Sequence, residues 1–310
     1  MVCGRNKKKD NAGIEKSSRN GQVRVESEVL WDDSKAFCQI GYPRGHRSSR
    51  YIGKIYNVEA QKLSAGIEGE NFSYGDDTYQ EVAVFPSPNP NGNIVAFMHG
   101  GGWVNGYKEW VAFMAPALNQ LGITFVSIGY RLAPKVMWPV GVKDIAKALK
   151  WIKDNINDHG GDSARLFIGG HSAGGHYASW LAVRDDWQES VGLAKEFIRG
   201  ALPVSGVYDF TPGNGMEMKP RFLGDSKVNE IDASPLHTIK RTPPFFITWG
   251  DRDLPPLIPQ AEKMTQALLD CGGKVETLIL SECDHAEASY ECGKSNGQWV
   301  PKLAKWIDSN

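Results

Sequence analysis

Residues 164–176 read Ala-Arg-Leu-Phe-Ile-Gly-Gly-His-Ser-Ala-Gly-Gly-His. The apolar run 166–168 leads through glycines to Ser172, and an apolar stretch with helical spacing follows at 177–183. This order predicts a strand, a tight turn with Ser172 at its apex, and a helix. A nucleophile in such a turn needs flanking glycines, because its neighbours approach closely and its own backbone is strained. The alternative is a glycine-rich connection with an incidental serine.

Strands alternate with helices along most of the chain. Apolar or alternating runs predict strands at 81–85, 94–98, 123–128, 166–168, 201–204, 245–249 and 275–280. Helical spacing predicts helices at 111–121, 142–156, 177–183, 259–269 and 299–307. The fold class is therefore α/β, with a mostly parallel central sheet and helices on both faces. Sites in such sheets form at the carboxyl ends of the strands.

Composition describes an ordinary globular protein. The 310 residues are 41% hydrophobic and 23% charged, with a formal net charge of −1. Dispersed charge gives no reason to expect a nucleic-acid partner, and no apolar run is long enough for a membrane span. Five cysteines at irregular spacing favour reduced thiols and a cytoplasmic location over a disulfide framework. A zinc site at Cys283, His285 and Cys292 matches no common spacing, so we expect no metal and no cofactor.

The chain is expected to form a single domain over residues 1–310. Residues 1–20 are polar, resemble no secretory signal and predict a flexible tail. Residues 21–75 show no sustained period and are expected to pack over the rest as a partial lid, in helical or irregular form. Residues 76–310 form the catalytic core. The sequence is compatible with a homodimer.

A serine nucleophile needs a base, and the base needs a third group to orient it. Of the seven histidines, His285 lies just beyond the last predicted strand, and we interpret it as the base. Asp253 and Asp251 both follow the preceding strand. Asp253 is favoured as the acid because its position lets it reach toward the histidine loop, whereas Asp251 could hydrogen-bond backbone amides. Ser205 also follows a strand but lacks flanking glycines, so we interpret it as a loop residue.

Stabilising the oxyanion requires backbone N–H groups. Ala173, directly after the serine, supplies one. Gly101 and Gly102, in His-Gly-Gly-Gly-Trp at 99–103, are candidates for the others, because glycine leaves its amides unhindered. His99, His171 and His176 belong to the two glycine motifs, where structural roles are expected.

These motifs together resemble α/β-hydrolases of the group that includes hormone-sensitive-lipase-like esterases and kynurenine formamidases. The resemblance covers roughly residues 72–308. Its remaining motifs are Tyr-Arg-Leu-Ala-Pro at 130–134, Ser-Gly-Val-Tyr-Asp at 205–209, Gly-Asp-Arg-Asp at 250–253 and Asp-His at 284–285. The resemblance implies the α/β-hydrolase fold, with Ser172, Asp253 and His285 as triad and the amides of 101, 102 and 173 as oxyanion hole.

The substrate stays open between two classes. Tyr-Gly-Asp at 74–76, Phe-Met-Ala-Pro at 113–116 and Ala-Ser-Pro at 233–235 resemble formamidases, as does Asp253 followed by Pro255 and Gln260. The formamidase loop, however, usually reads His-Gly-Gly-Tyr-Trp, whereas position 102 here is glycine, as in many carboxylesterases. We therefore expect an esterase acting on short acyl or small aromatic esters, with arylformamidase as the alternative. A non-catalytic binding homologue is a third interpretation.

The interval between the strands at 201–204 and 245–249 is short, which predicts a small lid. Within it, Met216, Met218, Phe222 and Leu223 either line an apolar pocket or serve ordinary packing. Met216 and Phe222, with Trp103 and His171, are the residues we assign to a substrate pocket. The expected partner is a small-molecule ester or amide.

Overall fold

The computed structural model describes residues 49–215, 222–224 and 226–310, with only the backbone described for 49–54. The chain divides into two units, 1–33 and 34–310, and every described residue belongs to the second. Met216 and Met218 lie outside the described residues, as does the expected tail at 1–20.

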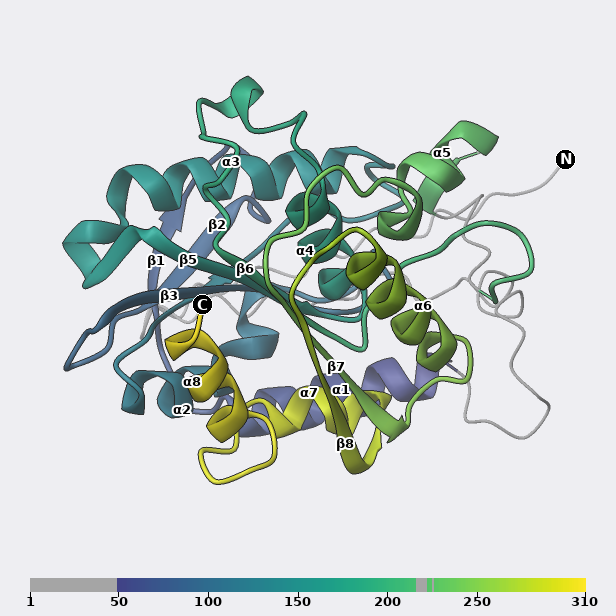
Figure 1. Ribbon diagram of the computed structural model, residues 1–310. Coiled ribbons are helices and arrows are strands. Elements are labelled where there is room, and N and C mark those ends of the chain that lie inside the picture. Colours follow the sequence, from purple (N-terminus) through teal and green to yellow (C-terminus); the bar gives the residue numbers. More distant parts are fainter. Residues whose placement is uncertain (1–48, 216–221, 225) are drawn as a thin grey trace, which may run out of the picture. The chain divides into compact units, whose positions relative to one another are not determined.

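The described residues contain one sheet of eight strands in the order β1-β2-β4-β3-β5-β6-β7-β8 (Figure 1). The strands are β1 Glu70–Ser73, β2 Glu81–Phe85, β3 Gly92–Met98, β4 Thr124–Ile128, β5 Gly161–His171, β6 Gly200–Val204, β7 Phe245–Arg252 and β8 Val275–Asp284. The pairs β1–β2 and β2–β4 are antiparallel. All the other pairs, β4–β3, β3–β5, β5–β6, β6–β7 and β7–β8, are parallel. The predicted fold class is confirmed.

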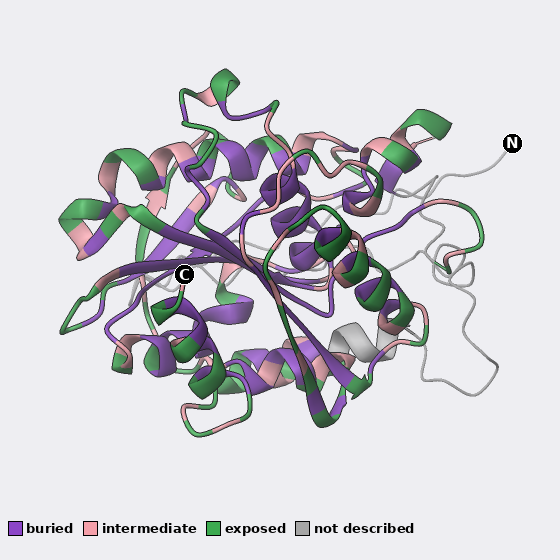
Figure 2. Cartoon of the chain, in the orientation of Figure 1, coloured by how far each residue is buried: buried purple, intermediate pink, exposed green. Residues whose placement is uncertain are grey.

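Both faces of the sheet are covered by helices, and the central strands therefore contribute to two cores. In β3, Ile94, Ala96 and Met98 enter one core, and Val95 and Phe97 enter the other. This alternation follows from the two-residue repeat of a strand. The central strands are accordingly buried along most of their length (Figure 2).

One core packs against α3 Val140–Asn155, α4 Ala173–Val183 and α6 Leu257–Asp270. The other packs against η2 Lys108–Met114, α2 Ala115–Gln120 and α8 Val300–Asp308 (Figure 1). The remaining helices are α1 Ser49–Leu63, η3 Ile156–His159, η4 Glu189–Val191, α5 Lys227–Asp232, η6 Pro235–His237 and α7 His285–Glu291.

Every predicted strand is present. The helical stretch predicted at 111–121 is also present, but it is divided between a 3-10 helix, η2, and a separate α-helix, α2. Pro116 lies in the first turn of α2, where its missing N–H is tolerated, and it starts a new helix there. The interval 21–75 contains a strand, β1, that the sequence missed. β1 is a short edge strand with three polar residues around Phe72, so it lacks an apolar repeat.

The sequence predicts a small lid in the interval between β6 and β7. The described residues of this interval contain one α-helix, α5.

A buried carboxylate joins the start of β2 to α3. Asp144 is fully buried and accepts hydrogen bonds from Gln80 Nε2 at 2.8 Å and from Arg131 Nε and Nη2 at 2.8 and 2.7 Å. The bidentate pair compensates the loss of solvent around the carboxylate. It also fixes the segment after β4 against α3.

We expect Asp144→Ala to lower the free energy of unfolding by about 3 kcal/mol, because it leaves Arg131 and Gln80 without their buried acceptor. Asp154→Ala on the same helix is the control, since Asp154 pairs with Lys150 at the surface and its loss should cost about 0.5 kcal/mol or less. Urea unfolding of both variants measures the difference. Equal losses would contradict the role assigned to Asp144.

Candidate active site

The turn between β5 and α4 places Ser172 at the carboxyl end of the sheet. Ser172 has φ 54° and ψ −114°, a conformation that L-residues rarely adopt, and its N–H donates to Val204 O at 2.9 Å. A Cβ on Gly174 would lie 2.2 Å from Met98 O, so α4 can approach β3 this closely only with glycine there. The strained serine and the close helix are the features expected of a nucleophile turn.

Asp253 and His285 are in direct contact across the ends of β7 and β8. Asp253 Oδ1 accepts from His285 Nδ1 at 2.7 Å and from Leu254 N at 2.7 Å. An ionised carboxylate only accepts, so Nδ1 carries the proton and Nε2 keeps its lone pair in the neutral ring. The Asp253 side chain is fully buried, whereas the His285 ring is 13% exposed and can be reached from outside.

Burial alone would raise the pKa of Asp253. The adjacent His285 and the hydrogen bonds from His285, Ser205 and Leu254 outweigh burial and hold this pKa below its usual value. The carboxylate is therefore ionised at neutral pH and able to stabilise a positive charge on His285.

Asp251, the other candidate, lies in a different environment. It is 41% exposed at the side chain, and its Oδ2 accepts from Glu282 N at 3.0 Å. The backbone amide it binds belongs to β8.

His171 brings the serine turn and the Asp253–His285 pair together. Its Nε2 donates to His285 O at 2.8 Å, and the centres of the two imidazole rings are 4.6 Å apart. Because Ser172 follows His171 directly in the chain, the three residues predicted as a triad gather at one edge of the sheet.

Ser205 contributes a contact that the sequence interpretation missed. It lies in the loop after β6, as expected, but its backbone has φ 51°, it is 1% exposed, and its Oγ donates to Asp253 Oδ2 at 2.5 Å. Its position directly after a parallel strand was a signal for a site residue. Which carboxylate it would bind depends on the order of strands in the sheet, and no local pattern gives that order.

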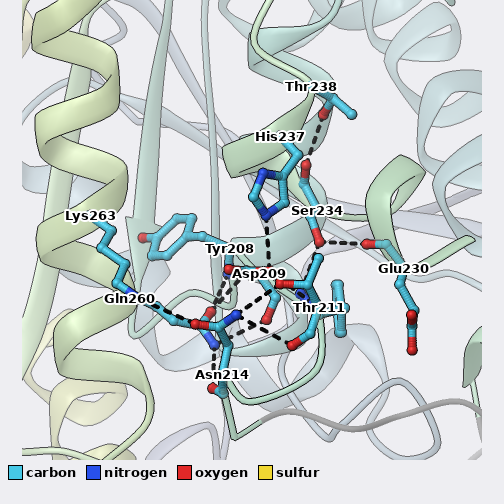
Figure 3. A network of polar contacts seen from close by, with 11 residues as sticks. Tyr208, Asp209, Thr211, Asn214, Glu230, Ser234, His237, Thr238, Gln260 and Lys263 are labelled. Atoms are coloured by element: carbon cyan, nitrogen blue, oxygen red, sulfur yellow. Dashed lines mark hydrogen bonds and ion pairs between the residues drawn. The ribbon is translucent and has the colours of Figure 1, made fainter. Parts of the chain in front are cut away.

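A polar network fixes the loop that follows Ser205 (Figure 3). Gln260 of α6 accepts from the N–H groups of Tyr208 and Asp209 and donates to the carbonyls of Asp209 and Asn214. The Asp209 carboxylate accepts from His237 Nε2 at 3.1 Å. The segment that carries Ser205 is therefore attached to α6 as well as to the sheet.

The loop at 99–103 offers unhindered amides next to this site. Gly101 has φ 118°, and a Cβ there would lie 2.2 Å from Asn105 O, so the loop requires glycine. Within the described part of the chain, the N–H groups of Gly101 and Gly102 donate no hydrogen bond. Ala173 is the first residue of α4, where the N–H lacks an intrahelical acceptor. These are the three residues predicted as the oxyanion hole.

Two of the buried histidines hold these loops in place. His176 accepts from Trp103 Nε1 at 3.0 Å and donates to Ala233 O at 2.7 Å, and burial lowers its pKa to about 3. His99 stacks on Tyr130 at 4.4 Å, and burial lowers its pKa to about 4. Both therefore stay neutral at physiological pH.

Three of the four residues assigned to a substrate pocket are buried. Trp103 and Phe222 stack on each other with ring centres 4.6 Å apart, and each is 2% exposed. His171 is 3% exposed and lies against His285. These three side chains are buried in packing contacts, and Met216 lies outside the described residues.

Three further points concern metal clusters, the state of the cysteines and helices that could cross a membrane. Among the described residues, no cluster of three His, Cys, Asp or Glu side chains is arranged to hold a metal ion, and the cysteines at 271, 283 and 292 are free thiols. Within this same part of the chain, every helix is too short or too polar to cross a membrane.

Comparison with known proteins identifies the family. Residues 95–289 match the model of a family described as having the alpha/beta hydrolase fold, and the chain belongs to this family. It resembles a hyperthermophilic esterase from the archaeon Pyrobaculum calidifontis with a TM-score of 0.69 at 21% identity, covering 84% of this chain and 93% of that one. A thermostable carboxylesterase from a metagenomic library gives a TM-score of 0.68 at 20% identity, covering 85% and 97% of the two chains. These likenesses show the fold.

Two curated relatives represent the two activities considered above. Esterase LipQ of Mycobacterium tuberculosis is 28% identical over 66% of this chain and 52% of its own length. Kynurenine formamidase of Danio rerio is 28% identical over 76% of this chain and 80% of its own length. The chain thus spans about half the length of LipQ but most of the formamidase.

We expect Ser205→Ala to lower kcat about tenfold, because Asp253 loses a charge-assisted hydrogen bond and no longer holds His285 as firmly. Ser87→Ala is the matched control: Ser87 is also buried and donates a hydrogen bond, to Asn119 O at the end of α2, away from this site. Steady-state kinetics with a chromogenic ester measures both. A kcat equal in the two variants would contradict the role of Ser205.

The same variant has a pH signature. The pKa of Asp253 is lower in the folded protein than in the unfolded chain, where it is about 4. The ionised carboxylate therefore stabilises the fold at pH values above about 4, and this stabilisation is lost as the pH falls through the folded-state pKa. Ser205→Ala raises the folded pKa of Asp253, so its deficit in unfolding free energy should be about 1 to 2 kcal/mol at pH 7 and shrink below about pH 4. Urea unfolding at both pH values measures this. A deficit that does not change with pH would assign the loss to packing.

Proposed function

We propose that this chain is a serine hydrolase that cleaves carboxylic esters of short acyl or small aromatic substrates through an acyl-enzyme. The observation that carries the proposal is the hydrogen-bonded Asp253–His285 pair, held by His171 beside a strained Ser172. A base oriented by a buried carboxylate next to a serine in a nucleophile turn is the arrangement that acyl transfer requires.

In the proposed reaction, Ser172 Oγ attacks the substrate carbonyl carbon and its proton moves to His285 Nε2. The imidazolium that forms is stabilised by Asp253, which stays ionised. The amides of Gly101, Gly102 and Ala173 donate to the oxyanion. His285 then gives its proton to the leaving oxygen or nitrogen, and a water molecule, deprotonated by His285, hydrolyses the acyl-enzyme and regenerates Ser172.

The second candidate is an arylformamidase, which would use the same groups on a formyl amide. The long match to the Danio rerio formamidase favours it. The glycine at position 102 departs from the usual formamidase tyrosine. A Cβ there would meet nothing within 4 Å, although φ 61° disfavours residues other than glycine. Esterase names among the curated relatives and structural neighbours favour the first candidate.

The proposal includes a cytoplasmic location, a single domain over 1–310, no cofactor and a small-molecule ester or amide as the only required partner. Its support is composition and motif content. A homodimer also stays a sequence-based prediction, which size-exclusion chromatography with light scattering would test.

We expect Ser172→Ala to lower kcat at least about 10³-fold, because the variant lacks the hydroxyl that forms the acyl-enzyme. Ser163→Ala, a serine-to-alanine change on β5, the strand that leads to Ser172, should retain full activity. Intact mass after treatment with a fluorophosphonate should show one adduct on wild type and on Ser163→Ala and none on Ser172→Ala. Retained turnover and labelling in Ser172→Ala would overturn the assignment.

Substrate class is decided by kcat/KM for p-nitrophenyl butyrate and for N-formylkynurenine with the same preparation. We expect the ester to be favoured. A large preference for the formyl amide would make the chain an arylformamidase. Activity on neither substrate, with Ser172 intact, would favour a non-catalytic binding protein.

A further inference from the structure

The helix α1 precedes the region matched by the family and lies against two segments of the candidate site. It packs on η2, which follows the glycine loop, and on α7, whose first residue is His285. Tyr56 is the residue of α1 at the centre of this contact and is 5% exposed. The position of Tyr56 is therefore coupled to the segment that carries the proposed base.

Tyr56 contacts both α7 and the residue next to the serine. Its ring stacks on His171 with centres 5.8 Å apart and planes 4° from parallel. It also stacks on Tyr290 of α7 at 5.2 Å, and its hydroxyl is hydrogen-bonded to Ser289 Oγ at 2.9 Å. Burial raises the pKa of this hydroxyl, so the ring stays neutral.

His171 is buried and contacts three parts of the site: His285, the glycine loop and α1. Its Nε2 donates to His285 O, and its Nδ1 lies so close to the glycine loop that a Cβ on Gly100 would be 2.8 Å away. Burial, together with the nearby His285, lowers the pKa of His171 to about 3, so the ring remains a neutral donor. The Tyr56 ring stacks on a face of this imidazole.

Tyr56 is itself held by contacts of the neighbouring residue. Asn57 Oδ1 accepts from Trp110 Nε1 at 2.8 Å and from Tyr107 Oη at 3.1 Å. Both donors belong to the segment between the glycine loop and α2. The Tyr56 ring also contacts this segment directly, because its centre lies 5.0 Å from that of the Trp110 ring, and it contacts α7 through Tyr290.

We propose that Tyr56 is a positioning residue, which holds His171 against the His285 backbone and so fixes His285 relative to Ser172. This inference rests on the proposed hydrolase function. It assigns part of the catalytic geometry to α1, because small displacements of a base relative to its nucleophile are costly in rate. Neither Tyr56 nor His171 needs to touch the substrate.

We expect Tyr56→Leu to lower kcat about 10- to 100-fold with KM changed less than about threefold, because substrate binding is kept while His285 loses its alignment. Phe72→Leu is the matched control. Phe72 stacks on Trp151 at 4.9 Å from the edge strand β1, so this variant also loses an aromatic stack but one remote from the site. A kcat loss no larger in Tyr56→Leu than in Phe72→Leu would overturn the proposal.

Two further variants distinguish a role of Tyr56 in positioning His285 from a general loss of stability. Tyr56→Phe keeps the stack on His171 and should recover most of kcat. His171→Phe keeps a ring beside Tyr56 but removes the donor to His285 O, and it should reproduce the loss seen in Tyr56→Leu. Loss in Tyr56→Phe together with full activity in His171→Phe would contradict the proposed route.

Proton NMR tests the same inference without substrate. The proton between His285 Nδ1 and Asp253 should give a far-downfield signal in wild type and in Phe72→Leu, and this signal should broaden or vanish in Tyr56→Leu. An unchanged signal in Tyr56→Leu would overturn the proposal. Because this readout needs no turnover, it distinguishes failure of the positioning role from failure of the hydrolase assignment, which Ser172→Ala tests.

Discussion

The close approach of α4 to the end of β3 is the constraint on which the site depends. The N-terminus of α4 lies against the backbone of Met98, and the missing side chain of Gly174 leaves the room for it. This contact turns the chain sharply enough to strain Ser172 and places the serine beside the loop at 99–103. The nucleophile turn and the candidate oxyanion loop are thus packed on each other by backbone contact, which leaves little freedom for either to move.

The site also requires a buried negative charge whose free energy of burial is compensated by hydrogen bonds. Asp253 is removed from water, and donors from three places compensate it: His285 after β8, Ser205 after β6 and the amide of Leu254. Burial raises the pKa of Asp253, whereas His285 and the hydrogen bonds to the carboxylate lower it. The lowering effect is the larger one, since the pKa of Asp253 is below its usual value. At His99 and His176, by contrast, burial outweighs the backbone hydrogen bonds, and both rings stay neutral. The same physical rule therefore separates the ionised Asp253 from these structural histidines.

Two helices hold the site in addition to the carboxyl ends of the strands. Gln260 of α6 holds the loop after Ser205, and Tyr56 of α1 stacks on His171. Both come from helices far in sequence from the serine. Local loops alone would be mobile, and these contacts give each loop a fixed partner on a helix.

The sequence by itself determined the fold class and every strand of the described sheet except β1, because each of these strands is marked by a local apolar or alternating pattern. The sequence also marked the strained turn at Ser172 by its flanking glycines, whereas the catalytic roles of Ser172, Asp253 and His285 stay predictions. It did not determine β1, which has a single apolar residue and exists because β2 offers it an edge. Nor did it determine that Ser205 reaches Asp253 or that Tyr56 reaches His171, since these contacts join residues far apart in the chain, and only the order of strands and the packing of α1 bring them together.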